Sequence, residues 1–216
     1  MMRRYKLFIF DFDGTLVDSR QHISKSVNYA LVKNRYEEVD PLLIYPTIGK
    51  VPIGEAFSLL KPDLSKQEIE KLTEDFRSYL LESAIKELIF FPGVEETLRK
   101  LIGLDRKLAI LTTKKASSIN RILKSLKVDS LFEVVYGGGM PGGDKPNKGC
   151  ILYIARKTKI PLDEIVMVGD TSVDSLSASN AGVDSIGVLY GIDGKKIEKA
   201  GFTHTIPNFI DLLNFT

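Results

Sequence analysis

The stretch KLFIFDFDGT, residues 6–15, decides the fold of this chain. Residues 6–10 are apolar and aromatic and end abruptly at two aspartates, which is typical of a buried parallel strand rather than a helix. Four later runs have the same character, and four helical patterns lie among them. We expect the later strands at Lys107 to Leu111, Glu133 to Tyr136, Ile165 to Val168 and Ser185 to Leu189, and the helices at Val94 to Ile102, Ala116 to Leu126, Lys148 to Thr158 and Ser172 to Ala181. This alternation predicts an α/β fold with a doubly wound parallel sheet, in which ligands bind at the carboxyl ends of the strands.

One region, residues 20–88, interrupts the alternation. It shows helical periodicity at Ser24 to Lys33, Pro52 to Leu60 and Ser65 to Ile85, and no convincing strand. Ser65 and Glu68 have the spacing of a capping box. An insertion directly after the first strand emerges beside the ligand-binding edge. We therefore expect an α-helical cap over residues 20–88 and a core formed by residues 1–19 and 89–216, the alternative being a helical subdomain without a gating role.

The composition is that of an ordinary globular protein of 216 residues, with 44% hydrophobic residues, 30 Lys and Arg, and 28 Asp and Glu. No long basic block is present of the kind that follows a nucleic-acid backbone. The N-terminal apolar run is too short for a signal peptide or a membrane span. Cys150 is the only cysteine, which excludes an intrachain disulfide and fits a reducing compartment. We expect a cytoplasmic protein, a monomer or weak homodimer, that binds neither nucleic acid nor membrane.

Carboxylates follow two of the predicted strands. Asp11 and Asp13 end the first strand, and two partly buried aspartates so close repel one another unless a cation compensates them. Gly14 permits a positive φ, so a turn can bring both side chains to one site. Asp170 ends a later strand, and Asp174 follows four residues on. Oxygen ligands without His or Cys suit Mg²⁺ rather than zinc. Taken alone, the first pair could be an exposed turn, and Asp174 a helix N-terminal acid.

Two further strand ends offer groups that bind phosphate. Thr112, Thr113 and Lys114 bring together a hydroxyl, backbone amides and the start of a helix, although Thr112 alone could be an N-cap. The glycine-rich loop of residues 137–146 delivers Lys145. This loop is not a P-loop, because it lacks the required Lys-Ser/Thr ending.

Together these residues resemble the haloacid dehalogenase superfamily. Its four motifs occur in order, as DxDGT at residues 11–15, Thr112 after an apolar strand, KP at residues 145–146 and GDxxxD at residues 169–174. The cap position and the sequence NYAL at residues 28–31 are most similar to phosphoglycolate phosphatase-like members. The resemblance covers nearly the whole chain and implies a Rossmann-like core with an inserted helical cap.

The resemblance also implies an activity, that of a Mg²⁺-dependent phosphoric monoester hydrolase acting on a small phosphorylated metabolite such as a phosphoglycolate-like ester. Asp11 would be the nucleophile that forms an aspartyl-phosphate, and Asp13 the general acid and base. Thr112 and Lys145 would hold the transferring phosphoryl group. Gly14 and Thr113 are the further residues expected to contact the substrate.

A metal site is implied at the same strand ends. Asp11, the backbone carbonyl of Asp13, and Asp170 would hold Mg²⁺, while Asp174 would bind it through water or orient a neighbour. Two positions depart from the relatives' pattern: Thr113 stands where they usually carry Asn, and Lys148 where they often carry a second proline. The identity of the substrate is therefore less certain than the chemistry.

Several alternatives stay within the same fold. Dehalogenases of the family lack the second aspartate of the first motif, so Asp13 favours a phosphate ester. A phosphoglucomutase would need an Arg and a His in the early cap, and residues 47–50 show no such pair, His22 being expected on a helix surface. A phosphonoacetaldehyde hydrolase would need a cap lysine, a place that only Lys50 could nominally take. Pyrophosphate or a nucleotide remains a competing substrate, and a catalytically inactive phosphate-binding regulatory module is the alternative from another class.

Overall fold

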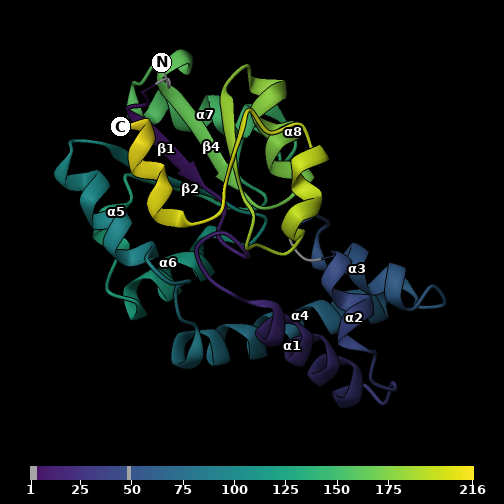
Figure 1. Cartoon of the computed structure of the whole chain (residues 1–216). Helices are drawn as coiled ribbons and strands as arrows, with labels where there is room; N and C mark the ends of the chain where they lie inside the picture. Colours follow the sequence, from purple (N-terminus) through teal and green to yellow (C-terminus); the bar gives the residue numbers. More distant parts are fainter. Residues whose placement is uncertain (1–3, 48–49) are drawn as a thin grey trace.

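A six-stranded, all-parallel sheet in the order β3-β2-β1-β4-β5-β6 forms the centre of the computed structural model (Figure 1). The structure describes residues 4–47 and 50–216, with only the backbone at residues 84, 85 and 87. Residues 1–3 at the N-terminus lie outside the described part. So do Ile48 and Gly49, which belong to the segment 47–50 in which the sequence shows no Arg–His pair. The strands are β1 Leu7–Phe10, β2 Lys107–Leu111, β3 Val134–Tyr136, β4 Ile165–Gly169, β5 Asp184–Val188 and β6 His204–Ile206. The expected α/β doubly wound, Rossmann-like core is confirmed, and β6 is a strand that the sequence patterns did not indicate.

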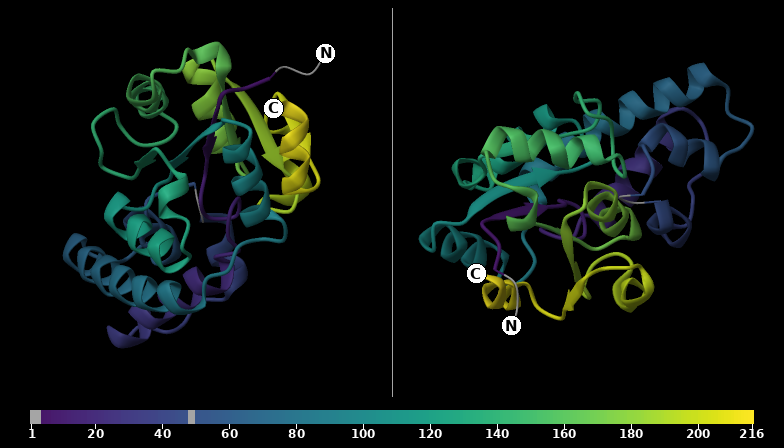
Figure 2. Two further views of the ribbon diagram at one scale, coloured as in Figure 1. Left: turned by 90° about the vertical axis from the view of Figure 1, so that its left-hand side faces the viewer. Right: turned by 90° about the horizontal axis from the view of Figure 1, so that it is seen from above.

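Helices cover both faces of the sheet. Strand side chains alternate between two hydrophobic clusters, so that Phe8 and Phe10 of β1 pack on one face and Leu7 and Ile9 on the other. The first face is covered by α5 Val94–Gly103, α6 Ala116–Ser125 and the 3₁₀ helix Phe209–Phe215, and the second by α7 Lys148–Thr158 and α8 Ser172–Ala181 (Figure 2). Shorter 3₁₀ turns span Tyr45–Thr47, Asp129–Leu131, Leu162–Glu164 and Gly194–Lys199.

The central strand β1 sets the position of the site. Phe10 is in register with Ile110 of β2 and with Val168 of β4, and the ladder continues as Asp11 N–H donates to the Val168 carbonyl over 2.9 Å. Asp11 directly follows β1, Thr112 directly follows β2 and Asp170 directly follows β4. The chemistry-bearing residues therefore leave three adjacent strands at one carboxyl edge.

The inserted helices form the cap at that edge, with α1 Arg20–Lys33, α2 Pro41–Ile44, α3 Ile53–Leu60 and α4 Lys66–Glu87 gathered at one end of the molecule (Figure 1). They enclose a hydrophobic cluster of their own, which includes Val27, Phe57 and Phe76. The capping box at the start of α4 is confirmed, since Ser65 N–H donates to Glu68 Oε2 over 2.7 Å and Glu68 N–H donates to Ser65 Oγ over 3.4 Å.

Two connections join the cap to the core, and they lie side by side. Val17 and Phe90 form an antiparallel bridge, and Phe91 N–H donates to the Leu16 carbonyl over 2.9 Å. The division of the chain at residues 19/20 and 88/89 stays a prediction. Among the described residues, no helix combines the length and the apolar character needed to cross a membrane.

Candidate active site

The turn after β1 brings two aspartates into one buried place. Gly14 has φ +86°, and its N–H donates to the Val17 carbonyl over 2.8 Å, which closes the turn. Asp11 and Asp13, which precede this turn, are both buried. A Cβ atom at Gly14 would lie 2.2 Å from Asp170 Oδ2, so only glycine lets the turn approach the carboxylate at the end of β4. That Asp11 and Asp13 converge on one metal site stays a prediction, because the group of mutually close carboxylates contains Asp11, Asp170 and Asp174.

A buried lysine joins two of the carboxylates. Lys145 Nζ lies 2.7 Å from Asp11 Oδ1 and 2.7 Å from Asp174 Oδ1. Although burial opposes it, the charges of Asp11 and Asp174 raise the pKa of Lys145 above its usual range. Burial raises the pKa of Asp11 to about 7, with Asp174 adding to the rise and Lys145 opposing it. The loop before α7 thus carries Lys145 into the site, as the glycine-rich sequence indicated.

Asp170 is held by two donors that the sequence patterns did not indicate. Thr15 Oγ donates to Asp170 Oδ1 over 2.9 Å, and Ile192 N–H donates to Asp170 Oδ2 over 2.7 Å. Burial, followed by the negative charges of Asp11 and Asp174, raises the pKa of Asp170 well above its usual value. Thr15 belongs to the first motif, so its position in the sequence was a usable signal, whereas Ile192 comes from the loop after β5 and offered none.

Asp174 has a partner for each oxygen. Its Oδ1 receives Lys145, and its Oδ2 accepts hydrogen bonds from Thr171 N–H over 3.0 Å and Thr171 Oγ over 2.8 Å at the start of α8. Asp174 therefore also stabilises the N-terminus of α8, which is the role expected from the sequence as the alternative to metal binding. Oxygens of Asp11, Asp170 and Asp174 nevertheless all lie within 4.8 Å of one another.

Asp13 pairs with a second lysine, Lys114, whose Nζ contacts Asp13 Oδ2. This contact was missed from the sequence, where Lys114 stood out only as part of the helix start after Thr112. Thr112 is buried, and its Oγ accepts a hydrogen bond from Lys114 N–H over 3.2 Å, so the hydroxyl orients the lysine's backbone. Lys148, in contrast, is exposed at the first position of α7 and does not line the cleft described below.

The charges and the donor set fit a divalent cation. Four buried carboxyl groups, those of Asp11, Asp13, Asp170 and Asp174, share the site with two lysines, Lys114 and Lys145, so full ionisation would leave a surplus of two negative charges. Within the described part of the chain, Asp11 Oδ2 and Asp13 Oδ1 are buried without a hydrogen-bond partner. Unpartnered buried carboxylate oxygens are costly unless a cation coordinates them, and an all-oxygen set suits Mg²⁺.

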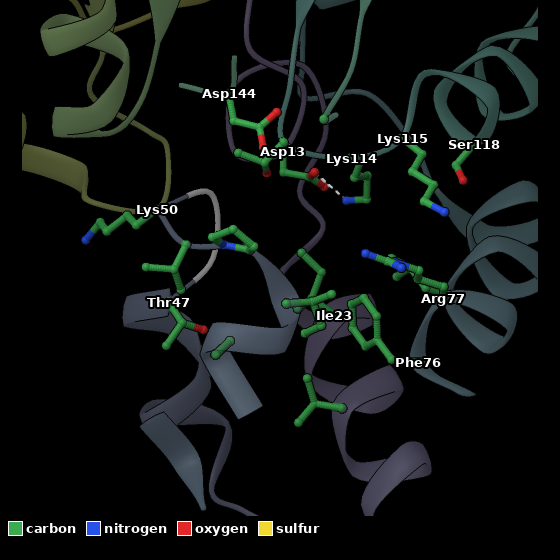
Figure 3. A pocket seen from close by; sticks show the side chains of 18 of the residues that line it. Asp13, Ile23, Thr47, Lys50, Phe76, Arg77, Lys114, Lys115, Ser118 and Asp144 are labelled. Atoms are coloured by element: carbon green, nitrogen blue, oxygen red, sulfur yellow. Dashed lines mark hydrogen bonds and ion pairs between the residues drawn. The ribbon is translucent and has the colours of Figure 1, made fainter. Parts of the chain in front are cut away.

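A cleft of about 300 Å³ separates this site from the cap (Figure 3). On the core side, Asp13, Thr113 and Lys145 line it, whereas the other predicted site residues, Asp11, Gly14, Thr112, Asp170 and Asp174, are not among its lining residues. On the cap side, the wall is largely apolar, with Ile23 and Phe76 prominent in Figure 3. A ligand in this cleft would contact core and cap together.

Known proteins with sequences similar to this chain match it over most of its length. The family model described as haloacid dehalogenase-like hydrolase matches residues 8–188. A phosphoglycolate phosphatase of Colwellia psychrerythraea is 31% identical over 220 residues, covering 98% of this chain and 97% of the relative. One of Mannheimia succiniciproducens is 31% identical over 198 residues, covering 88% of each chain.

Solved structures are similar as well. A hydrolase from Pseudomonas syringae superposes with a TM-score of 0.80 at 26% identity, covering 99% of this chain and 97% of the other. A protein described as a predicted phosphoglycolate phosphatase from Haemophilus somnus superposes with a TM-score of 0.86 at 26% identity, covering 99% of each chain. The similarity therefore includes the cap as well as the core.

Proposed function

This chain belongs to the haloacid dehalogenase-like hydrolase family, and we propose that it is a Mg²⁺-dependent phosphatase of small phosphorylated metabolites, with Asp11 as its nucleophile. The observation that carries the proposal is the environment of Asp11. One of its oxygens receives Lys145 while the other is buried without a hydrogen-bond partner in the described residues. A fixed and incompletely solvated carboxylate, held by a lysine that lines the cleft, suits nucleophilic attack on phosphorus.

In the first step, a carboxylate oxygen of Asp11 forms a bond to phosphorus as the bond from phosphorus to the substrate alcohol breaks. Asp13 gives a proton to the departing alcohol oxygen, which leaves as a neutral alcohol. Lys145 and Thr112 hold the phosphoryl oxygens in line with Asp11, and Gly14 and Thr113 complete the contacts with the substrate. The product of this step is an aspartyl-phosphate.

In the second step, a water molecule attacks the aspartyl-phosphate. Asp13, now a carboxylate, takes a proton from this water as the new oxygen–phosphorus bond forms and the bond to Asp11 breaks. Inorganic phosphate leaves, and both aspartates return to their starting forms. Lys114, which contacts Asp13, would hold the Asp13 side chain in place between the two steps.

Asp11, the backbone carbonyl of Asp13, and Asp170 would hold Mg²⁺ directly, and Asp174 would act through Lys145, Thr171 or a bound water. When bound, the ion would lower the repulsion between the anionic ester and the carboxylates. The surplus of negative charge among these side chains supports this assignment.

The substrate that we propose is a phosphoglycolate-like ester, because the relatives named above are phosphoglycolate phosphatases. We propose the cytoplasm as its compartment, since the single cysteine, Cys150, forms no disulfide and a buried thiol is compatible with a reducing environment. The cap, residues 20–88, would act as a lid, because the cleft lies between it and the core.

The decisive experiment measures phosphate release from p-nitrophenyl phosphate with and without Mg²⁺. We expect release by the wild type that chelation abolishes, and for Asp11→Asn a loss of at least about a thousandfold, since the nucleophile is removed. Glu74→Gln, a substitution on the exposed surface of α4, is the matched control for the loss of one carboxylate. Absence of Mg²⁺-dependent release by the folded wild type would favour the inactive phosphate-binding module instead.

A further inference from the structure

Five cationic side chains line the cleft, and three of them are engaged by carboxylates. Lys114 contacts Asp13, Lys145 contacts Asp11 and Asp174, and Lys50 of the cap lies 2.7 Å from Asp193 of the core. The remaining two are Arg77 and Lys115, and in the described part of the chain neither has an ion pair or a side-chain hydrogen bond. Both side chains are therefore open to a ligand.

These two side chains come from opposite sides of the cleft. Arg77 belongs to α4 of the cap and Lys115 immediately precedes α6 of the core, and the two helices pack against each other. Figure 3 shows both side chains directed into the space between cap and core, with Ser118 beside Lys115. Both are exposed to solvent at the rim of the cleft.

Two features of this rim favour an anion, although the carboxylates of Asp13 and Asp144 also line the cleft. Lys115 occupies the N-cap position of α6 and no side chain caps that helix, so the positive end of the helix dipole adds to the lysine charge. Arg77 and Lys115 carry the same charge, so neither can serve as a counter-charge for the other. An anionic group between them would pair with both charges at once.

The geometry points to a second anion-binding subsite, formed by Arg77 and Lys115, that receives a carboxylate or phosphate group on the alcohol portion of the substrate. This inference rests on the proposed function, since the first anionic group is the phosphate ester at Asp11. The substrate class is therefore a phosphomonoester whose alcohol itself carries a negative charge. The remaining cap wall, which is largely apolar, offers such a group no other charged partner, because Lys50 is already paired.

The test compares phosphoglycolate with 2-hydroxyethyl phosphate, in which a neutral hydroxymethyl group replaces the carboxylate, and with ethanediol bisphosphate, in which the second anion is a phosphate. For Arg77→Gln and for Lys115→Gln, we expect the preference in kcat/KM for the charged esters over the neutral one to fall about tenfold, mostly through KM. Arg77→Lys, which keeps the charge, should retain part of the preference for the charged esters. Whichever charged ester loses more identifies the anion that the subsite accepts.

Lys66→Gln on α4 and Lys124→Gln on α6 are the matched controls, because each removes one exposed positive charge from the same helix without touching the cleft. We expect neither to change the preference by more than about twofold. The subsite is wrong if the Arg77 and Lys115 variants lose activity equally on charged and neutral esters, or if the controls reproduce their effect.

A binding measurement separates this inference from the proposed function. The variant Asp11→Asn, which cannot turn over, is titrated calorimetrically with phosphoglycolate and with 2-hydroxyethyl phosphate, with and without Arg77→Gln in the same chain. Tighter binding of phosphoglycolate that Arg77→Gln removes supports the subsite even if no ester is hydrolysed by the wild type. Equal binding of the two ligands overturns the subsite even if the phosphatase activity is confirmed.

Discussion

Gly14 links the backbone turn to the chemistry of the site. Its positive φ makes the turn, and the absence of a side chain lets Asp170 approach. Most positive-φ glycines can be replaced at the expense of local strain alone. At Gly14 a side chain would also occupy the space of a carboxylate that we assign to the metal.

We expect Gly14→Ala to lower the free energy of unfolding by more than about 1 kcal/mol and to raise the Mg²⁺ concentration for half-maximal activity at least about tenfold, because the new Cβ displaces Asp170. Urea unfolding and a Mg²⁺ titration of phosphate release measure the two effects. Gly93→Ala is the control, since Gly93 has φ +77° with nothing within 4 Å of its Cβ position. A similar Mg²⁺ requirement in both variants would contradict the argument.

For single residues, the sequence predicts which side chains lie at strand ends, but it does not predict contacts that depend on the tertiary fold. Asp11, Asp170 and Lys145 follow strands or a glycine-rich loop, and the parallel topology alone gathers them at one edge. The pairing of Lys114 with Asp13 depends on the direction of a long side chain. No local pattern encodes that direction.

Among the secondary-structure elements, the pairing of α1 with α4 depends on a buried carboxylate. Asp75 of α4 accepts hydrogen bonds from Lys33 Nζ and from Asn34 Nδ2, each over 2.8 Å, at the end of α1. These bonds, that of Lys33 first, lower the pKa of Asp75 to about 2. Since the folded-state pKa lies below the unfolded value, the ionised form of Asp75 stabilises the fold.

We expect Asp75→Asn to destabilise the protein by about 1 kcal/mol near neutral pH, because the charged hydrogen bonds weaken. The contribution of Asp75 is present above about pH 4 and is lost as the pH falls from there towards about 2, so the difference between variant and wild type should shrink over that range. Urea unfolding of both proteins at several pH values measures this difference in stability. A difference that is independent of pH would assign the effect to packing rather than charge.

Element length decides which elements the sequence reveals. The long helices and the four- and five-residue strands show clear periodicity or apolar runs and were predicted within one to three residues at most boundaries. Strand β6 and helix α2, with three and four residues, are too short to establish a period. Strand β3 is equally short but reads as a continuous Val-Val-Tyr run, whereas β6 contains His204 and Thr205. Strand β6 pairs with β5, and α2 packs against its sequence neighbours α1 and α3.

The molecule as a whole contains hydrophobic clusters that do not merge, because the cap cluster is distinct from the two that flank the sheet. Phe57 is fully buried in the cap, where its ring packs edge-on against Phe76 at 6.3 Å between centroids. Separate clusters allow separate opening, which a lid requires. How the cap lies over the core, and hence that Arg77 and Lys115 line one cleft, was not accessible from either segment's sequence alone.

Replacing Phe57 with alanine should remove about 3–5 kcal/mol of stability from the cap through the cavity it leaves. Hydrogen exchange followed by mass spectrometry should show lost protection in residues 20–88, with β1 and β4 still protected. Leu98→Ala, in the cluster that α5 forms with the sheet, is the matched control and should expose the core. Uniform loss of protection in the Phe57 variant would mean that cap and core open as one cooperative unit.

The central position of β1 has a consequence for folding during translation. Leu7–Phe10 is synthesised first, yet its neighbours are β2, which begins at Lys107, and β4, which begins at Ile165. At roughly 5–20 residues per second, translation leaves this apolar strand without either partner for at least about 5 seconds. During that interval the cap helices can already fold, while the nascent strand that precedes Asp11 is a natural client for a chaperone.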